Sequence, residues 1–364
     1  MHGTERYALE LAENLPKDKY DVYIATPSSG PLSDLIKKKN LKEIVYHNGS
    51  FNKFTLKGSI NLFKEIKRHK FDIIHANSGI IPCIIGKLLR IKLCIEIKHG
   101  VFYSNNQLEK ISKLNFFKEY IKQNFVDFFI AISENDKQRL IKFFKIKADK
   151  IKVVYNGLNT NEIDKQIVKD AAAQKNNSNG KIVIGTIGRY NYQKAYDVLV
   201  EAVDLVVSEK KSVQFYFIGT GEEESKIKQL VKDKNLEQYI TFIGYTKEIF
   251  KYLRSFDIFV LTWIYEGVPY VILEAMYMEI PIICTRVGGI DNILTNNENA
   301  LITESDSPIL TSQAIFKMVS NPDLRKKLSK NSKELIKLYT SEKMAKNTSN
   351  LYIDFLKNNF TQYW

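Results

Sequence analysis

The sequence contains little cysteine and no long uninterrupted run of hydrophobic residues. Its three cysteines, Cys83, Cys94 and Cys284, each lie in an apolar stretch. This placement favours buried free thiols in a reducing cytosol over a disulfide framework or a metal site. The longest apolar stretch, residues 78–97, is interrupted by three cationic side chains. It therefore falls short of the roughly 18 residues that a membrane span requires.

The first residues also lack the pattern of a signal peptide. They are acidic and carry apolar side chains at helical spacing from Tyr7 to Leu15. A signal peptide would instead begin with a basic segment and continue with an apolar one. We therefore expect a cytoplasmic protein. Its 364 residues, 44% of them hydrophobic, are enough for two domains with separate cores.

Negative charge is scarce in the first half of the chain. Residues 1–160 contain 28 Lys and Arg but only 16 Asp and Glu, so they carry +12 of the net charge of +13. This asymmetry favours an anionic partner for the first half, such as a phospholipid surface, a polyanionic acceptor or nucleic acid. No recognition motif supports nucleic acid, so we expect none as a partner.

Runs typical of β-strands alternate with helical patterns in both halves of the chain. The runs are, in order, YDVYIAT, LKEIVYH, FDIIHANS, KLCIEIKHG, DFFIAIS, IKVVYNG, KIVIGTIGR, SVQFYFIGTG, YITFIGY, FDIFVLTWI, IPIICTRVGG and NALITE. This alternation predicts parallel sheets with ligands at the carboxyl ends of the strands. The expected fold class is α/β, with two doubly wound Rossmann-like domains facing a cleft and C-terminal helices closing the chain.

Composition along the chain predicts the domain boundaries. Residues 1–170 form the N-terminal α/β domain, and the polar residues 171–180 form a linker. Residues 181–340 form the C-terminal α/β domain. Residues 341–364 form a last helix that we expect to pack back toward the N-terminal domain.

The run KIVIGTIGR leads into a candidate phosphate site. Its strand ends at Gly188 and is followed by Arg189, a loop with Lys194, and a helix. A glycine turn, two cations and a helix N-terminus together suit a phosphate group. Two solvated cations on an ordinary loop are the alternative, and this motif alone does not decide between them.

A second candidate site lies in the segment YEGVPYVILEAM. Glu266 and Glu274 flank a GxPxxxxEA pattern in which Gly267 and Pro269 lead into a helix. Proline suits the first helical turn, because its missing N–H would be unpaired there anyway. One carboxylate could then meet a sugar and the other a ribose. Spacing alone leaves an alternative open, in which one glutamate caps the helix and the other is merely exposed to solvent. The outward amides expected at the positive end of the helix dipole are those of Tyr270, Val271 and Ile272.

These motifs resemble those of retaining glycosyltransferases of family 4, which have the GT-B fold. The resemblance rests on GRYNYQKAYDVLVEA, FIGTGEEESKIKQLV, the segment from YITFIGY to VILEAM, and IPIICTRVGGI. In the first half it rests on GTERYALELA, FDIIHANS, IKHG, DFFIAISENDKQRL and IKVVYNGLN. The blocks match in order and spacing over nearly the whole chain.

The resemblance implies roles for individual residues. Arg189 and Lys194 would hold the donor diphosphate, Glu266 would contact the donor sugar and Glu274 the ribose hydroxyls. His99 would lie beside the donor sugar in the first domain; without the resemblance, we would interpret this histidine as structural. The implied catalytic set is His99, Glu266, Arg189 and Lys194. The wider donor-binding set adds Gly3, Gly188, Gly244, Tyr245, Gly267, Tyr270, Val271, Ile272 and Glu274, with Gly244 and Tyr245 cradling the base.

The implied reaction moves a sugar from a UDP- or GDP-linked donor to a hydroxyl group with retention of configuration. The departing phosphate would accept the proton of the nucleophile. No cofactor and no metal are expected, because the chain has no Asp-x-Asp motif and fixed cations could neutralise the diphosphate. Two departures from the family pattern, Thr262-Trp263-Ile264 and GGIDN at residues 288–292, put the identity of the sugar in doubt.

The resemblance also raises an expectation about the start of the chain. The family's first strand precedes a glycine-rich loop, and Met1 to Gly3 match the end of that loop. We therefore expect that the first strand of the N-terminal domain is missing from this sequence. The cause would be a start assigned to an internal Met, or a truncated gene.

Two other functions remain open. The first is a non-catalytic or truncated GT-B protein that binds membrane or polyanion. An apolar stripe flanked by lysines supports it, although an ordinary packed helix is an equal alternative; the stripe consists of Leu108, Ile111, Leu114, Phe117, Ile121 and Phe125. The second is a nucleotide-sugar epimerase, which would need more histidines than the five present. An active enzyme in polysaccharide or glycolipid assembly, with a glycan or lipid-linked acceptor at the inner face of the plasma membrane, accommodates the stripe as well.

Overall fold

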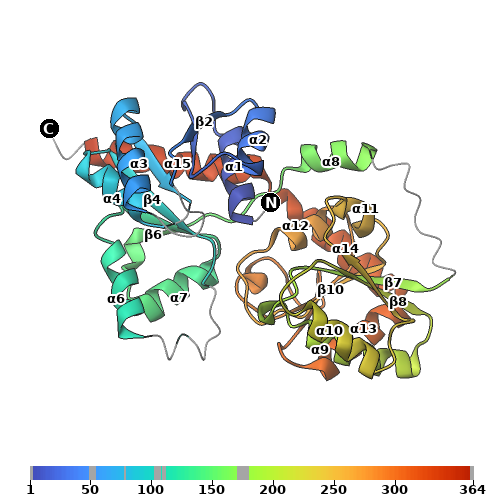
Figure 1. Cartoon of the computed structure of the whole chain (residues 1–364). Helices are drawn as coiled ribbons and strands as arrows, with labels where there is room; N and C mark the ends of the chain where they lie inside the picture. Colours follow the sequence, from blue (N-terminus) through green and yellow to red (C-terminus); the bar gives the residue numbers. More distant parts are fainter. Residues whose placement is uncertain are drawn as a thin grey trace. The chain divides into compact units, whose positions relative to one another are not determined.

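The computed structural model describes residues 3–48, 55–77, 79–101, 108, 112–169 and 180–360. The chain divides into two compact units (Figure 1). Unit 1 combines Met1–Leu158 with Tyr339–Trp364, and unit 2 is Asn159–Leu338. The linker expected at 171–180 lies, except for its last residue, outside the described residues.

Unit 1 contains the following helices and strands: α1 (Gly3–Asn14), β1 (Tyr23–Thr26), α2 (Pro31–Lys38), β2 (Lys42–Val45), α3 (Leu56–His69), β3 (Ile73–Ala76), α4 (Ile81–Leu88), β4 (Leu93–Lys98), α6 (Lys113–Lys122), β5 (Phe128–Ala131), α7 (Glu134–Phe144), η1 (Ala148–Lys150), β6 (Ile151–Val153) and α15 (Ser341–Phe360). Strands β3, β4, β5 and β6 form a parallel sheet in that order, and β1 pairs with β2 in a separate parallel pair.

Unit 2 contains α8 (Thr160–Lys169), β7 (Ile182–Ile187), η3 (Tyr192–Lys194), α9 (Tyr196–Glu209), β8 (Val213–Ile218), α10 (Glu224–Asp233), β9 (Ile240–Gly244), α11 (Ile249–Leu253), β10 (Ile258–Leu261), α12 (Tyr270–Tyr277), β11 (Ile282–Thr285), η4 (Ile290–Asn292), β12 (Leu301–Thr303), α13 (Pro308–Ser320), α14 (Pro322–Leu335) and η5 (Ile336–Leu338). The strands described in this unit form a parallel sheet with the order β12-β11-β10-β7-β8-β9. Each of the twelve expected strands is found, and the α/β fold class is confirmed.

Helices cover the central strands of unit 2 on both faces, so these strands are buried throughout. The residues of β10 and β11 are all buried, as are nearly all of those in β7. This explains their continuous apolar runs, because a parallel strand covered on both faces has no solvent side. Helix α9 also fits closely, with Leu199, Val203 and Val206 completely buried against β8 and α13. The result is a rigid sheet whose carboxyl edge carries the candidate site residues.

The last helix of the chain belongs to unit 1. Helix α15 packs against α1 and contacts β4. Tyr352 of α15 lies 2.6 Å from Nδ1 of His75 on β3, and Tyr20 lies 2.9 Å from Ser349 Oγ. Main-chain hydrogen bonds between Leu158 and Tyr339 and between Ser341 and Leu158 join the two segments of the unit. Unit 1 is thus closed by residues that follow unit 2 in the sequence.

Other features bear on the expectations from sequence. All three cysteines are buried and unpaired, as expected. Among the described residues, no helix is both long and apolar enough to cross a membrane. The missing first strand stays a prediction; in the described part of unit 1, strand β1 does not pair with β3.

Candidate active site

The loop after β7 is held against the loop after β8 by close backbone contacts. The N–H of Tyr190 donates to the Thr220 carbonyl, and the N–H of Glu223 donates to the Tyr190 carbonyl. Gly219 has φ +139°, and a Cβ there would lie 1.9 Å from the Gly188 carbonyl oxygen. A side chain at Gly219 would therefore push the two loops apart. The GTG sequence, which could be mistaken for a dinucleotide motif, serves here to let the loops meet.

Lys194 and Glu266, 72 residues apart in sequence, form an ion pair at the carboxyl edge of the sheet. Their side chains are only 12% and 14% exposed. Gln193 donates from Nε2 to Glu266 Oε2 at 2.6 Å and to the Tyr265 carbonyl at 2.9 Å. Burial lowers the pKa of Lys194, the Glu266 carboxylate opposes this effect, and the charge of Arg189 adds to it. The cations and carboxylate predicted from sequence are thus brought together.

Trp263 lies under the same ammonium group. Lys194 Nζ lies 3.3 Å from the centroid of the Trp263 ring, a cation–π contact with a nearly buried indole. The preceding Thr262 donates from Oγ1 to the Ala195 carbonyl at 2.9 Å, which ties the loop after β10 to the start of α9. Sequence reasoning treated Trp263 only as a departure from a family pattern and missed Gln193. The structure gives both residues a place around Lys194.

Glycine packing also fixes the main chain of Glu266. Gly288 has φ +53°, and a Cβ at this position would lie 1.4 Å from the Glu266 carbonyl oxygen. The N–H of Gly289 donates to the Gly267 carbonyl at 3.2 Å. The GG pair after β11 thus supports Glu266 from behind, in a conformation that a residue with a side chain adopts only with strain.

Helix α12 begins one residue later than expected. Pro269 is its N-cap rather than its first helical residue, with φ −77° and ψ 136°. The N–H of Ile272 donates to the Pro269 carbonyl at 3.1 Å, so this amide does not point outward, contrary to the expectation. Because Pro269 keeps an extended backbone, its carbonyl closes the first turn. Glu274 is the fifth residue of α12 and is buried.

The remaining donor-site candidates of unit 2 lie at the ends of neighbouring strands. Gly188 and Arg189 follow β7, and Arg189 is exposed. Gly244 ends β9 with φ +74°, and its carbonyl accepts a hydrogen bond from the Gly219 N–H at 2.9 Å. The next residue, Tyr245, is 66% exposed. Because the strands are parallel and adjacent, all of these residues share one edge of the sheet.

The candidates of unit 1 lie near each other within that unit. His99 follows β4, and its Nε2 lies 2.8 Å from Asn77 Oδ1 at the end of β3. Asn77 in turn donates from Nδ2 to the Thr4 carbonyl at 2.8 Å, next to Gly3 at the start of α1. The ring of buried Tyr7 meets the His99 ring edge-on at 5.1 Å. Burial lowers the pKa of His99 to about 4, so this ring is neutral at neutral pH.

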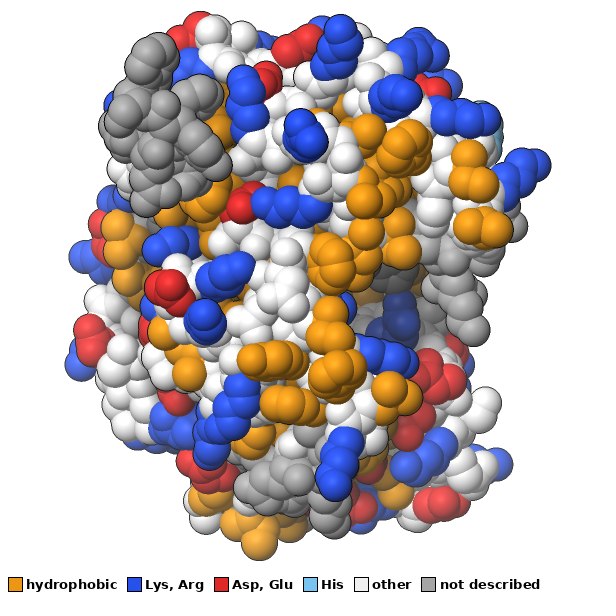
Figure 2. All heavy atoms as spheres, turned by 90° about the vertical axis from the view of Figure 1, so that its left-hand side faces the viewer, with side chains coloured by type: hydrophobic (Ala, Val, Ile, Leu, Met, Phe, Trp, Pro, Cys, Tyr) orange, Lys and Arg blue, Asp and Glu red, His pale blue; other side chains and the backbone are white. Residues whose placement is uncertain are grey.

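The predicted apolar stripe is only partly a surface feature. Leu108 is buried in the core of unit 1, which contradicts its assignment to the stripe, and Ile111 lies outside the described residues. Helix α6 itself has no buried residue, and Leu114 and Phe117 are 61% and 55% exposed. Figure 2 shows one face of the molecule, on which hydrophobic side chains gather among many Lys and Arg side chains.

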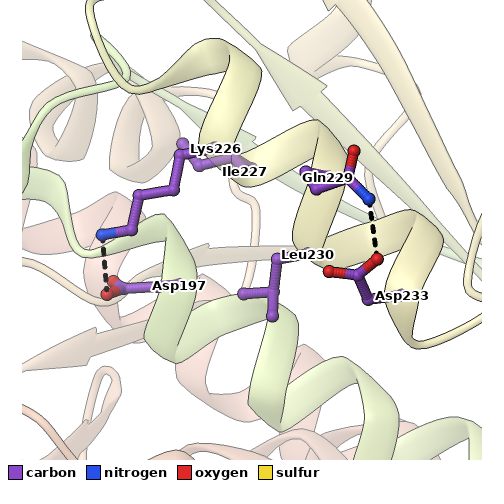
Figure 3. A pocket seen from close by; sticks show the side chains of 6 residues that line it. All are labelled: Asp197, Lys226, Ile227, Gln229, Leu230 and Asp233. Atoms are coloured by element: carbon purple, nitrogen blue, oxygen red, sulfur yellow. Dashed lines mark hydrogen bonds and ion pairs between the residues drawn. The ribbon is translucent and has the colours of Figure 1, made fainter.

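A surface hollow between α9 and α10 contains none of the expected site residues (Figure 3). Lys226 Nζ lies 4.0 Å from Asp197 Oδ2 across it, and Gln229 donates to Asp233 at 2.7 Å. The charged groups that line the hollow are thus paired with one another. The chemistry-bearing residues lie instead at the carboxyl edge of the sheet.

Two family models match the chain, one in each half. One is described as glycosyltransferase family 4 and matches residues 1–162, and the other is described as glycosyl transferases group 1 and matches residues 168–335. The chain is a family 4-like glycosyltransferase of the GT-B fold.

Relatives of this glycosyltransferase extend over nearly its whole length. The UDP-Gal:alpha-D-GlcNAc-diphosphoundecaprenol alpha-1,3-galactosyltransferase of Escherichia coli is 24% identical over 370 residues, covering 98% of this chain and 95% of the relative. The capsular polysaccharide biosynthesis glycosyltransferase CapM of Staphylococcus aureus is 25% identical, covering 95% and 93%. The crystal structure of Anabaena Alr3699/HepE in complex with UDP-glucose superposes with a TM-score of 0.82 at 17% identity, covering 97% and 96%. These similarities explain the shared two-unit α/β architecture.

Proposed function

We propose that this glycosyltransferase moves a sugar from a UDP- or GDP-linked donor to a hydroxyl group of a glycan or lipid-linked acceptor, with retention of configuration. The reaction would belong to the assembly of a bacterial polysaccharide or glycolipid. The observation that carries the proposal is the group formed by Lys194, Arg189 and Glu266 at the carboxyl edge of the unit 2 sheet.

The chemistry of this group suits a diphosphate joined to a sugar. Lys194 and Arg189 supply positive charge where negative charge develops on the leaving diphosphate. Glu266 supplies an acceptor for sugar hydroxyls next to those cations. The Lys194–Glu266 ion pair holds both side chains in place before a donor arrives, which reduces the ordering cost of binding. A neighbour in fold binds UDP-glucose, and a relative is named for using UDP-Gal; both support a nucleotide-sugar donor.

Retention and metal independence are part of the proposal. In a front-face displacement, the departing phosphate oxygen takes the proton of the acceptor hydroxyl while the new glycosidic bond forms on the same face of the sugar. Such a step needs positioning and charge stabilisation rather than a dedicated base. Fixed cations at Lys194 and Arg189 could meet the diphosphate without a divalent ion.

The acceptor side of the proposal rests on unit 1. The first 160 residues carry +12, and α6 exposes Leu114, Phe117 and Tyr120 next to exposed Lys113 and Lys118. Apolar side chains flanked by lysines favour the surface of an anionic bilayer. We therefore place the protein at the inner face of the plasma membrane, where a lipid-linked acceptor would be presented. The name of the E. coli relative, which contains a diphosphoundecaprenol acceptor, supports this choice.

A donor screen tests the proposed function. Purified protein is incubated with UDP- and GDP-linked sugars, with and without polyprenyl-diphosphate glycans, and released nucleotide and product are measured. Lys194→Ala should reduce turnover at least tenfold, about 1.4 kcal/mol. Lys226→Ala, which removes a lysine that forms an exposed ion pair on the same unit, is the control and should leave turnover unchanged.

Two measurements on the active donor test the mechanism. NMR of the initial product gives the anomeric configuration, and inversion would refute retention. Turnover should continue in EDTA; complete loss that Mg²⁺ or Mn²⁺ restores would refute metal independence. Absence of nucleotide release with every donor and acceptor would favour the non-catalytic alternative.

A further inference from the structure

The indole ring of Trp263 and the ammonium group of Lys194 come from two different loops of unit 2. Lys194 is the last residue of η3, and Trp263 is the second residue after β10. Lys194 Nζ lies 3.3 Å from the centroid of the Trp263 ring. The tryptophan is 4% exposed and the lysine side chain 12%, so neither group is freely hydrated. A cation–π contact is strongest under such desolvated conditions.

The main chain holds Trp263 against the loop that carries the lysine. On one side, Thr262 donates from Oγ1 to the Ala195 carbonyl at 2.9 Å. On the other side, the N–H of Ile264 donates to the Gln193 carbonyl at 2.9 Å. Trp263 lies between these two hydrogen bonds, and both lead to residues that adjoin the lysine in the sequence. The position of the ring relative to the ammonium group is therefore fixed before any ligand arrives.

The charge of Lys194 depends on the groups around it. The titratable groups that face the ammonium are Glu266, after β10, and Arg189, after β7. Burial lowers the pKa of Lys194, the charge of Arg189 lowers it further, and the Glu266 carboxylate raises it. Of the two titratable groups, Glu266 is thus the one that favours the charged form. The face of an indole ring carries negative potential, so Trp263 also favours the ammonium over the neutral amine.

The proposed function uses Glu266 for a second purpose. When its carboxylate accepts hydrogen bonds from sugar hydroxyls, it is shared between the sugar and Lys194. The face of the Trp263 ring is already covered by the ammonium group, so the sugar does not compete for it. The ring therefore keeps stabilising the cation while the carboxylate turns to the donor. An ammonium has three N–H donors, which is enough for Glu266 and a phosphate oxygen together.

We propose that Trp263 is a positioning residue that keeps the Lys194 ammonium group charged and available to the donor diphosphate while Glu266 binds the sugar. This inference rests on the proposed function, in which Lys194 meets the diphosphate. It requires only residues of unit 2. It also gives a role to the segment Thr262-Trp263-Ile264, in which this chain departs from the family pattern.

NMR of lysine labelled with ¹³C at Cε follows the protonation of Lys194 without any ligand. The full chain carries Trp364→Phe, so that Trp263 is its sole tryptophan. The Lys194 signal is identified by its loss in Lys194→Met. Trp263 is then replaced by mono-, di- and tetrafluorotryptophan, because fluorine withdraws electron density from the ring face and leaves the shape of the ring nearly unchanged.

The pKa of Lys194 should fall with each step of the fluorinated series, by about one pH unit in all. An unchanged pKa across the series would overturn the proposal. The ε-methylene protons of Lys194 should also show a ring-current shift that Trp263→Leu abolishes. Absence of this shift from the protein with unmodified Trp263 would overturn the contact itself.

Kinetics with the active donor test the consequence for transfer. The basic limb of kcat/KM should move to lower pH in step with the fluorination, because the neutral amine no longer meets the diphosphate as a cation. At alkaline pH, Trp263→Leu should lower kcat/KM at least tenfold, and Trp263→Phe, which keeps a smaller ring, should lie between. The matched control is Tyr277→Leu, which removes a ring that lies 3.8 Å from Lys333 Nζ elsewhere in unit 2. It should leave the basic limb in place.

The two experiments separate failure of this inference from failure of the proposed function. If the protein transfers sugar and its basic limb does not move with fluorination, the role of Trp263 is refuted while the function stands. If it transfers none but the pKa of Lys194 follows the fluorination, the action of the ring on Lys194 is supported and the function is refuted. Should Trp263→Leu fail to fold, the fluorinated series still decides, because a merely structural role would not move the basic limb.

Discussion

Removing only one charge of the Lys194–Glu266 pair should destabilise unit 2 more than removing both. Lys194→Met keeps the aliphatic stem over the Trp263 ring but deletes the ammonium group, and Glu266→Gln keeps the shape of the carboxylate but deletes its charge. In the single variant Lys194→Met, a carboxylate that is 14% exposed loses its cation. Among the described residues it then keeps the Gln193 amide as its side-chain donor. The double variant leaves neither the ammonium group of Lys194 nor the carboxylate of Glu266 without its partner.

The size of the effect follows from this burial. Removing one partner of a buried pair costs about 3–5 kcal/mol, and both side chains here retain slight contact with solvent, so we expect about 3 kcal/mol for Lys194→Met. This expected loss of about 3 kcal/mol includes the loss of the cation–π contact with Trp263. The double variant should be destabilised by about 1 kcal/mol, because two neutral side chains of similar shape then share the pocket. The resulting coupling energy is about 2 kcal/mol or more.

Urea unfolding, followed by tryptophan fluorescence, gives the free energy of unfolding of the wild type, of each single variant and of the double variant, which together form a double-mutant cycle. The sequence has two tryptophans, Trp263 and Trp364, and Trp263 touches the pair directly. Trp364→Phe in every variant makes the signal specific for unit 2. Additive free energies of unfolding in the cycle would refute the ion pair. Nucleotide-sugar turnover is measured in parallel: the double variant should regain stability but no activity, and wild-type turnover in it would refute the donor-site assignment.

Four further predictions concern other parts of the molecule. Glu274→Ala should weaken donor binding at least tenfold, measured by calorimetry; unchanged affinity would contradict a contact with the ribose. Gly288→Ala should lower the melting temperature of unit 2 and reduce turnover, since its Cβ would overlap the main chain behind the ion pair; a protein that melts and turns over like the wild type would contradict that overlap. His75 has a pKa lowered to about 3 by burial, so between about pH 6.5 and pH 3 the unfolded chain binds a proton that the folded chain does not. Stability should therefore fall as pH falls, by about 1.4 kcal/mol per pH unit from this group, and His75→Gln should remove that part of the slope. Charge reversal at Lys113 and Lys118 should reduce flotation with anionic vesicles and leave neutral vesicles unaffected; equal flotation would exclude this surface.

The strands, and the residues at the carboxyl edge of the unit 2 sheet, could be predicted from sequence because both depend on local sequence patterns. Each strand of unit 2 is a short apolar run, and the residues that follow it come directly after the run. Glu266 and Lys194 could each be placed at a strand end in this way. Their mutual ion pair could not, because spacing within a segment says nothing of which loop faces which across 72 residues.

Other features could not be predicted, because they depend on tertiary contacts that a local sequence pattern does not show. Leu108 has the helical spacing of the surface stripe, yet it is buried, because periodicity identifies an apolar face and not what covers it. Asn77 and Gln193 lie in two of the blocks that carry the resemblance, but nothing singled them out, since an amide at a strand end or in a loop is common. The start of α12 was misplaced by one residue, because Pro269 is compatible with the N-cap and with the first turn alike.

The chain order of unit 1 affects how the protein is made on the ribosome. Residues 159–338 are contiguous, so unit 2 can fold as soon as it has emerged. Unit 1 begins earlier but waits for α15, whose Tyr352 covers His75 and whose packing closes α1. The N-terminal half is thus completed last, after about 180 further residues have been synthesised. During that interval the side of α1 that packs against α15 has not yet met this partner, so folding of α1 depends on residues made much later.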